Sequence, residues 1–244
     1  MLGLFFSGNL DPVPGIGLIF IVGSTLAGFI AYRLYRARMR MDPGERARAV
    51  ALADLQWYFT VLCIFWLVDI FPHVLLIIAG VSVSVLTTTH WAAHVFLFIT
   101  VVLTVRIATS FLNPAWKTRA TILTGILMVS ALAFSAVRPD HLDYIPGSVY
   151  PLISADPYFS HFYTFASTVS AGFFGLYLVL RGLAALNSLG IRMVLMGLGF
   201  ISQVAIGVVI AYVHVWYTPA LIYTLIICWV MFPGMSALMS VSKK

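Results

Sequence analysis

The chain has 244 residues, of which 61% are hydrophobic and only 9% are charged. A soluble domain has about 25% charged residues and fewer apolar ones, so this composition excludes a soluble globular protein. It also excludes a disordered chain, a disulfide-rich scaffold and a nucleic-acid-binding module, although the net charge is +6. Cys63 and Cys228 lie within apolar stretches, which favours a packing role over disulfide formation. The sequence predicts a single integral membrane domain over 1–244, an all-α bundle of transmembrane helices.

The apolar stretches, taken in chain order, predict about seven spans, each long enough to cross about 30 Å of hydrocarbon. No Lys or Arg precedes the first stretch, so we expect an uncleaved N-terminus rather than a signal peptide. The predicted spans are 14–35, 50–71, 90–112, 118–137, 160–184, 191–215 and 218–241. The turn at 185–191 is short, so the fifth and sixth spans should be antiparallel neighbours, and their small residues should allow close contact.

The segment 73–89 is apolar but short for a crossing. It could cross the membrane, form a hairpin on one side, or extend the preceding helix. Without a crossing, 13 of the 14 Lys and Arg residues lie on one side and only Arg138 lies opposite, whereas a crossing divides them equally. Because cytoplasmic loops hold the excess of Lys and Arg, we predict no crossing. The expected topology has the N-terminus outside, the C-terminus inside, and 73–89 as a short half-depth segment on the outer side.

Histidines gather on one side of the membrane in this topology. All six fall on the outer side or in the outer part of a span: His73, His90, His94, His141, His161 and His214. His90 and His94 are four residues apart and share one helix face. Imidazoles from separate helices suit a transition metal or a haem iron. We therefore predict a haem b site held by His94, His161 and His214, or a metal site that also includes His90.

Asp69 and His73 are also four residues apart, near the outer end of the second span. A carboxylate beside a histidine commonly orients a metal-bound imidazole, so we predict a supporting role for both residues. Two further interpretations of the histidines stay open. They could be interfacial packing residues, since imidazole is amphipathic, or they could form a proton relay or pH sensor.

Two other features bear on function. Arg106 lies in the inner half of the third span, and we predict that its side chain extends to the headgroups rather than pairing with Asp54. The connection 138–159 is the longest polar one and contains four prolines, so we expect an ordered lid or docking surface on the outer side.

These observations predict a redox subunit of a membrane oxidoreductase complex, with haem b or another metal near the outer face. It would pass electrons between a quinol and a protein partner on that side, and a quinone is a further candidate ligand. One alternative is a seven-helix sensor that reads an outer ligand or pH, and another is a small-solute transporter or channel. We expect the protein to lie in the lipid bilayer of a prokaryotic cytoplasmic membrane and to bind no nucleic acid.

Overall fold

The computed structural model describes residues 12–79, 83–138, 141–144, 151–154, 156–185, 187–209 and 219–241. These ranges fold mainly into long helices. The helices are α2 (Pro12–Met39), α3 (Pro43–Arg48), α4 (Val50–Ala79), α5 (Val83–Leu112), α6 (Lys117–Val137), α7 (Pro157–Ser167), α8 (Phe173–Ala185), α9 (Ser188–Val208) and α10 (Pro219–Val241). A 3-10 turn, η1 (Pro114–Trp116), precedes α6, and a π-helical turn, η2 (Thr168–Gly172), joins α7 to α8.

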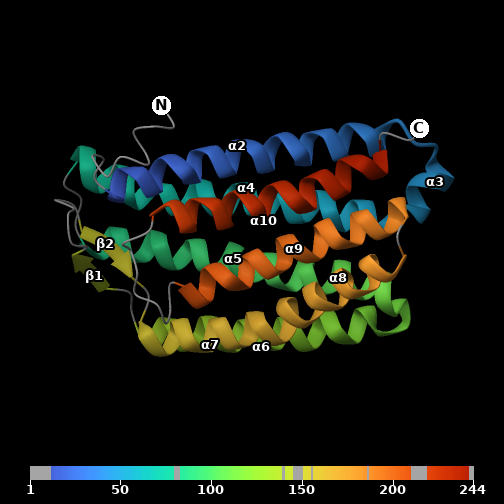
Figure 1. The fold of residues 1–244 in the computed structure, drawn as a ribbon. Coiled ribbons are helices and arrows are strands. Elements are labelled where there is room, and N and C mark those ends of the chain that lie inside the picture. The colour runs from blue at the N-terminus through green and yellow to red at the C-terminus, as the bar shows by residue number, and fades with distance from the viewer. Residues whose placement is uncertain are drawn as a thin grey trace.

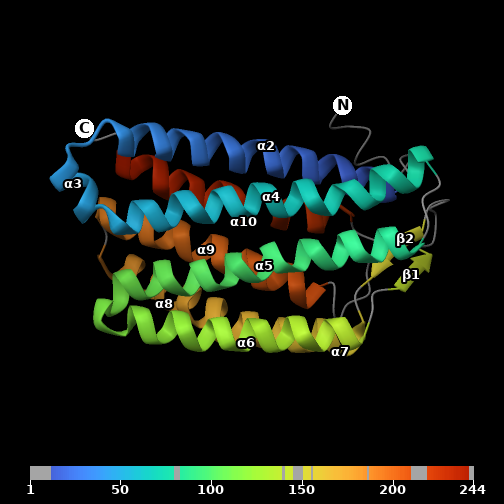
Figure 2. The same cartoon turned by 180° about the vertical axis from the view of Figure 1, so that it is seen from behind.

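The long helices lie side by side and alternate in direction (Figure 1). At one side of the bundle α2 packs against α4 and α10, and at the other side α6 packs against α5 and α7. Between these two sides, α5 lies against α4 and α9 lies against α10, as the reverse view also shows (Figure 2). The predicted contact of the fifth and sixth spans is confirmed, because α8 packs along α9.

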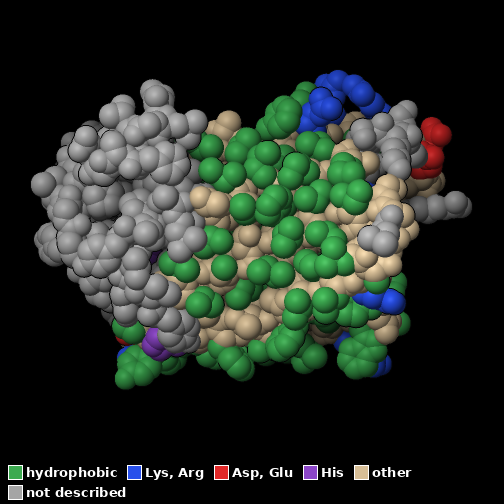
Figure 3. Space-filling view, in the orientation of Figure 1, with side chains coloured by type: hydrophobic (Ala, Val, Ile, Leu, Met, Phe, Trp, Pro, Cys, Tyr) green, Lys and Arg blue, Asp and Glu red, His purple; other side chains and the backbone are tan. Residues whose placement is uncertain are grey.

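The two ends of the bundle differ in charge. We call the end where α2 finishes and α9 begins the arginine end, and the opposite end, where α5 begins, the histidine end. Lys and Arg side chains gather at the arginine end, while hydrophobic side chains cover the middle of the visible face (Figure 3). Among the described residues, Arg138 is the basic residue at the histidine end, where it pairs with Asp156 at 3.5 Å.

Several helices are long and apolar enough to cross a membrane. In the described part of the chain, five such spans are Val50–Ile70, Thr87–Leu112, Pro114–Val137, Ser160–Ala185 and Ser188–Val208. A shorter apolar helix covers Thr224–Met239. The protein is therefore an all-α integral membrane protein that contacts the lipid bilayer. The total of about seven spans and the orientation of the termini stay predictions.

The expected half-depth segment at 73–89 is wrong as a separate element. Residues 73–79 continue α4 to Ala79, and residues 83–89 form the first turns of α5. The structure thus favours the extension of the preceding helix, divided between two helices. A helix satisfies its own backbone hydrogen bonds, whereas an irregular segment at membrane depth leaves polar groups to be covered by other protein. The apolar run therefore continues the helices, and α4 passes through Pro72.

Aromatic side chains fill the core between α4, α9 and α10. Tyr58, Phe59, Trp66, Phe200 and Trp229 are all buried. The rings of Trp66 and Trp229 meet edge to face with centroids 5.3 Å apart, a geometry that favours ring pairs. The indole Nε1 of Trp229 donates a hydrogen bond of 2.6 Å to the Tyr58 hydroxyl, which satisfies both buried polar groups.

Helices α8 and α9 approach each other closely because glycines face one another. A Cβ atom added to Gly182 would lie 2.5 Å from the carbonyl oxygen of Gly190, and one added to Gly197 would lie 2.4 Å from that of Gly175. Real Cβ atoms do not come so near, so these positions exclude any side chain. This confirms the prediction that small residues allow close helix contact.

The connection 138–159 contains a short antiparallel hairpin. Its strands are β1 (His141–Tyr144) and β2 (Pro151–Ser154), with His141 opposite Ser154 and Tyr144 opposite Pro151. The segment is thus ordered over these strands. Its predicted role as a docking surface for a protein partner stays a prediction.

Candidate functional site at the histidine end

A carboxylate and an imidazole face each other between α4 and α5. The Nε2 atom of His90 lies 3.6 Å from Oδ1 of Asp69, and the two side chains are 13% and 9% exposed. This distance is too long for a direct hydrogen bond, but it is short enough for an ion pair when His90 is protonated. An ionisable pair within apolar helices is a candidate functional site by default.

His94 continues this cluster one turn further along α5. The rings of His90 and His94 have centroids 4.7 Å apart, and His94 is buried. One turn further along α5, Phe98 stacks on His94 with ring centroids 6.3 Å apart. Phe98 also stacks on Tyr163 of α7 with ring centroids 5.7 Å apart. The four-residue spacing predicted from the sequence therefore places three rings of α5 in one column. We call Asp69, His90 and His94 the Asp–His cluster.

The other predicted site residues come from α4, α7, β1 and a segment outside the described residues. His161 lies in the second turn of α7, and His141 lies in β1. His214 lies outside the described residues, as do the side chains of His73 and His141. The structure places His90 of the neighbouring helix beside Asp69, and the pairing of Asp69 with His73 stays a prediction.

The described residues can be tested against the predicted metal or haem. Within them, no group of three or more His, Cys, Asp or Glu side chains could hold a metal ion. The stack of His94, Phe98 and Tyr163 fills the contact between α5 and α7 at this level. The haem between His94 and His161 stays a prediction.

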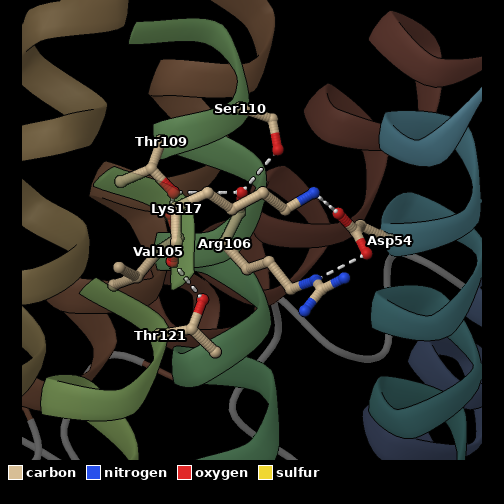
Figure 4. A network of polar contacts seen from close by, with 7 residues as sticks. All are labelled: Asp54, Val105, Arg106, Thr109, Ser110, Lys117 and Thr121. Carbon is tan, nitrogen blue, oxygen red and sulfur yellow. Dashed lines mark hydrogen bonds and ion pairs between the residues drawn. The ribbon is translucent and has the colours of Figure 1, made fainter. Parts of the chain in front are cut away.

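A second ionic site lies at the arginine end, and it corrects one expectation. Arg106 does not simply extend to the headgroups: its Nε donates to Oδ1 of Asp54 at 2.8 Å (Figure 4). The Nζ of Lys117 donates to the other oxygen, Oδ2, at 2.5 Å. Asp54 is 6% exposed, so two cations neutralise a buried carboxylate. The reason is that a buried carboxylate without a cationic partner is strongly destabilising, whereas a half-exposed Arg is already partly solvated.

Sequence reasoning also missed a polar layer in the middle of the bundle. Tyr163 lies close to Ser167 and Gln203. The hydroxyl of Thr104 donates to the side-chain oxygen of Gln203 at 3.5 Å, and Thr104 also contacts Tyr58. Four of these residues are buried and Tyr163 is partly buried. Gln203 was a visible signal, because an amide inside an apolar span requires polar partners.

Comparisons with protein families, with curated proteins and with solved structures find no match for this chain. The candidate functional sites in the described residues are therefore the two ionic sites and the polar layer between them.

Proposed function

We propose that the protein is a membrane-embedded sensor that responds to protons at its histidine end, with the Asp–His cluster as the proton-binding site. The observation that carries this proposal is the buried approach of His90 Nε2 to Asp69 Oδ1 at 3.6 Å. Histidine is the side chain whose charge ordinarily changes between about pH 5 and 8. The uptake of one proton by His90 is sufficient to change the charge of the pair.

The charge of His90 would act on the contact between α4 and α5. When His90 is neutral, the buried carboxylate of Asp69 faces an uncharged ring. When His90 is protonated, opposite charges face each other across the two helices at 3.6 Å. His94 packs on His90 and transmits a change in ring position to Phe98 and Tyr163 of α7. Protonation would therefore favour one packing of α4, α5 and α7 over another.

Tryptophan fluorescence of the purified protein between about pH 5 and 8 tests this proposal. Trp91 follows His90 directly, and Trp66 lies one turn before Asp69, so both report on the cluster. We expect a reversible transition in the wild type that disappears in Asp69→Asn and His90→Gln. His161→Gln is the matched control at the same end and should keep the transition. A wild type without a transition, or variants that all retain it, would overturn the proposal.

The redox subunit is the second candidate, and one observation favours it. A carboxylate behind an imidazole, as Asp69 lies behind His90, is the arrangement that orients a metal-bound histidine. Elemental analysis and an absorption spectrum of the purified protein distinguish the two proposals. Stoichiometric metal or a haem band that is lost in His90→Gln and His94→Gln would replace the sensor by the redox subunit. Flux into proteoliposomes tests the transporter alternative.

A further inference from the structure

A hollow opens between four helices at the arginine end. Its lining comes from α5 with Phe111, α8 with Leu178, and α9 with Met193 and Met196. The hollow is shallow, with a cavity volume of about 10 Å³ at the base of its open mouth. The remaining lining side chains are Leu189, Arg192 and Ser236. A guanidinium group therefore lies in a wall that is otherwise mostly apolar.

Arg192 has no anionic partner in the described structure. Its Nε is buried, and no hydrogen-bond acceptor among the described residues reaches it. Ser236 cannot serve this role, because its hydroxyl donates to the backbone carbonyl of Arg192 at 2.9 Å. Asp54, a buried carboxylate at this end, is engaged by Arg106 and Lys117. A buried donor without an acceptor is unfavourable, so the site favours an incoming anion.

The place of Arg192 in α9 adds to this preference. The helix begins at Ser188, and the side chain of Asn187 caps it by accepting from the Gly190 amide at 2.9 Å. Arg192 thus lies in the first turns of the helix, near the positive end of its dipole. A cation is unfavourable at that end and an anion is favourable, so an anion beside Arg192 would improve both interactions.

We propose that this hollow binds the headgroup phosphate of an anionic phospholipid. The phosphate would accept from Arg192, and the first carbons of the acyl chains would lie along Phe111, Leu189 and Met193. A free phosphate would use only the guanidinium and leave the apolar wall unpaired. An anionic lipid uses both, and basic sites between membrane helices on the side rich in Lys and Arg are typical places for such headgroups.

Native mass spectrometry of the full chain in detergent tests the proposal, with phosphatidylglycerol, phosphatidylcholine or inorganic phosphate added. We expect phosphatidylglycerol to remain bound and phosphatidylcholine and phosphate not to. In Arg192→Gln, phosphatidylglycerol should bind at least about tenfold more weakly, because a charge-assisted hydrogen bond is lost. Arg181→Gln is the matched control: this Arg lies exposed at the same end and bonds to the Tyr177 hydroxyl at 3.1 Å, so its loss should leave binding unchanged.

A second variant covers the case in which Arg192→Gln does not fold. Leu189 is 49% exposed and lines the mouth of the hollow, so Leu189→Trp should fill the hollow while Arg192 is kept. Weaker phosphatidylglycerol binding in this variant supports the proposal. Equal binding in the wild type, Arg192→Gln and Leu189→Trp would overturn it. So would equal binding of phosphatidylcholine, or displacement of the lipid by inorganic phosphate.

Discussion

Helix α4 carries two buried carboxylates, Asp54 near its start and Asp69 about two-thirds of the way along, and the two have different partners. At the arginine end, Asp54 binds Arg106 and Lys117 at 2.8 and 2.5 Å. At the histidine end, Asp69 faces His90 at 3.6 Å. Both carboxylates link α4 to α5. The Asp54 contact with Arg106 joins two charged groups, whereas the Asp69 contact is ionic only when His90 is protonated.

The comparison separates a permanent contact from a conditional one. Arg and Lys keep their charge at every physiological pH, so the Asp54 contacts persist under all such conditions. The partner of Asp69 is charged only when it holds a proton. The arginine end can therefore act as a fixed anchor while the histidine end changes.

Replacing Asp54 by Asn should have the largest effect on stability. It leaves Arg106 and Lys117 without the anion that neutralises them, and breaking a buried ionic contact costs about 3 kcal/mol or more. Arg106 is 39% exposed, so water will recover part of this loss and the lower figure applies. Denaturant unfolding in detergent micelles measures the change. Asp42→Asn, an exposed position at the same end, is the control and should change little. An equally stable Asp54→Asn protein would show that the anchor does not exist.

Replacing Lys117 by Met should lower the free energy of unfolding by a smaller amount, about 2 kcal/mol. Asp54 keeps Arg106 in this variant, so the carboxylate still has one cationic partner. Lys117 is only 16% exposed, whereas Arg106 is 39% exposed, so removing Lys117 should cost more than Arg106→Gln. Unfolding curves of the two variants side by side give the order. The reverse order would indicate that Arg106 carries the anchor.

Replacing Tyr58 by Phe tests a neutral contact between the two ionic sites. The variant leaves the buried indole Nε1 of Trp229 without its acceptor, which should cost about 1 to 2 kcal/mol. Neither partner changes charge between about pH 5 and 8, so the loss should be the same across this range. Thermal unfolding of the variant and the wild type at about pH 5 and at about pH 8 measures the loss of stability at each end of this range. A loss that grows at one pH would mean that the centre of the bundle is coupled to the Asp–His cluster.

The architecture was largely predictable from the sequence, because length and hydropathy alone decide where apolar helices form. The close contact of α8 and α9 was also visible in the small residues such as Gly182 and Gly190. The segment 73–89 was not, because charge counts say on which side a segment lies but not whether it continues a helix. The backbone's need for hydrogen bonds decides that question, and it extends α4 to Ala79.

The sites were predictable only where the partners lie on one helix. His90 and His94 are four residues apart, and their contact followed from helix geometry. Asp69 was singled out, but its contact with His90 was not predicted, because His90 comes from the next helix and sequence spacing relates only residues of one helix. Contacts such as Tyr58 with Trp229 join residues 171 positions apart. They depend on which helix faces are neighbours, and a single sequence does not contain that information.

A lysine in place of His90 would make the ionic contact at the histidine end resemble the one at the arginine end. His90→Lys gives Asp69 a permanent cation in place of a conditional one. The change in stability near neutral pH should be small, within about 1 kcal/mol, because the attraction in a buried ion pair is largely offset by the desolvation of the new charge. The fluorescence transition between about pH 5 and 8 should nevertheless disappear, because no proton is needed to charge the partner. His161→Lys, at the same end but outside the cluster, should retain the transition. If His90→Lys also retained it, the titrating group would lie elsewhere, and the difference between the two carboxylates of α4 would not be one of permanent against conditional charge.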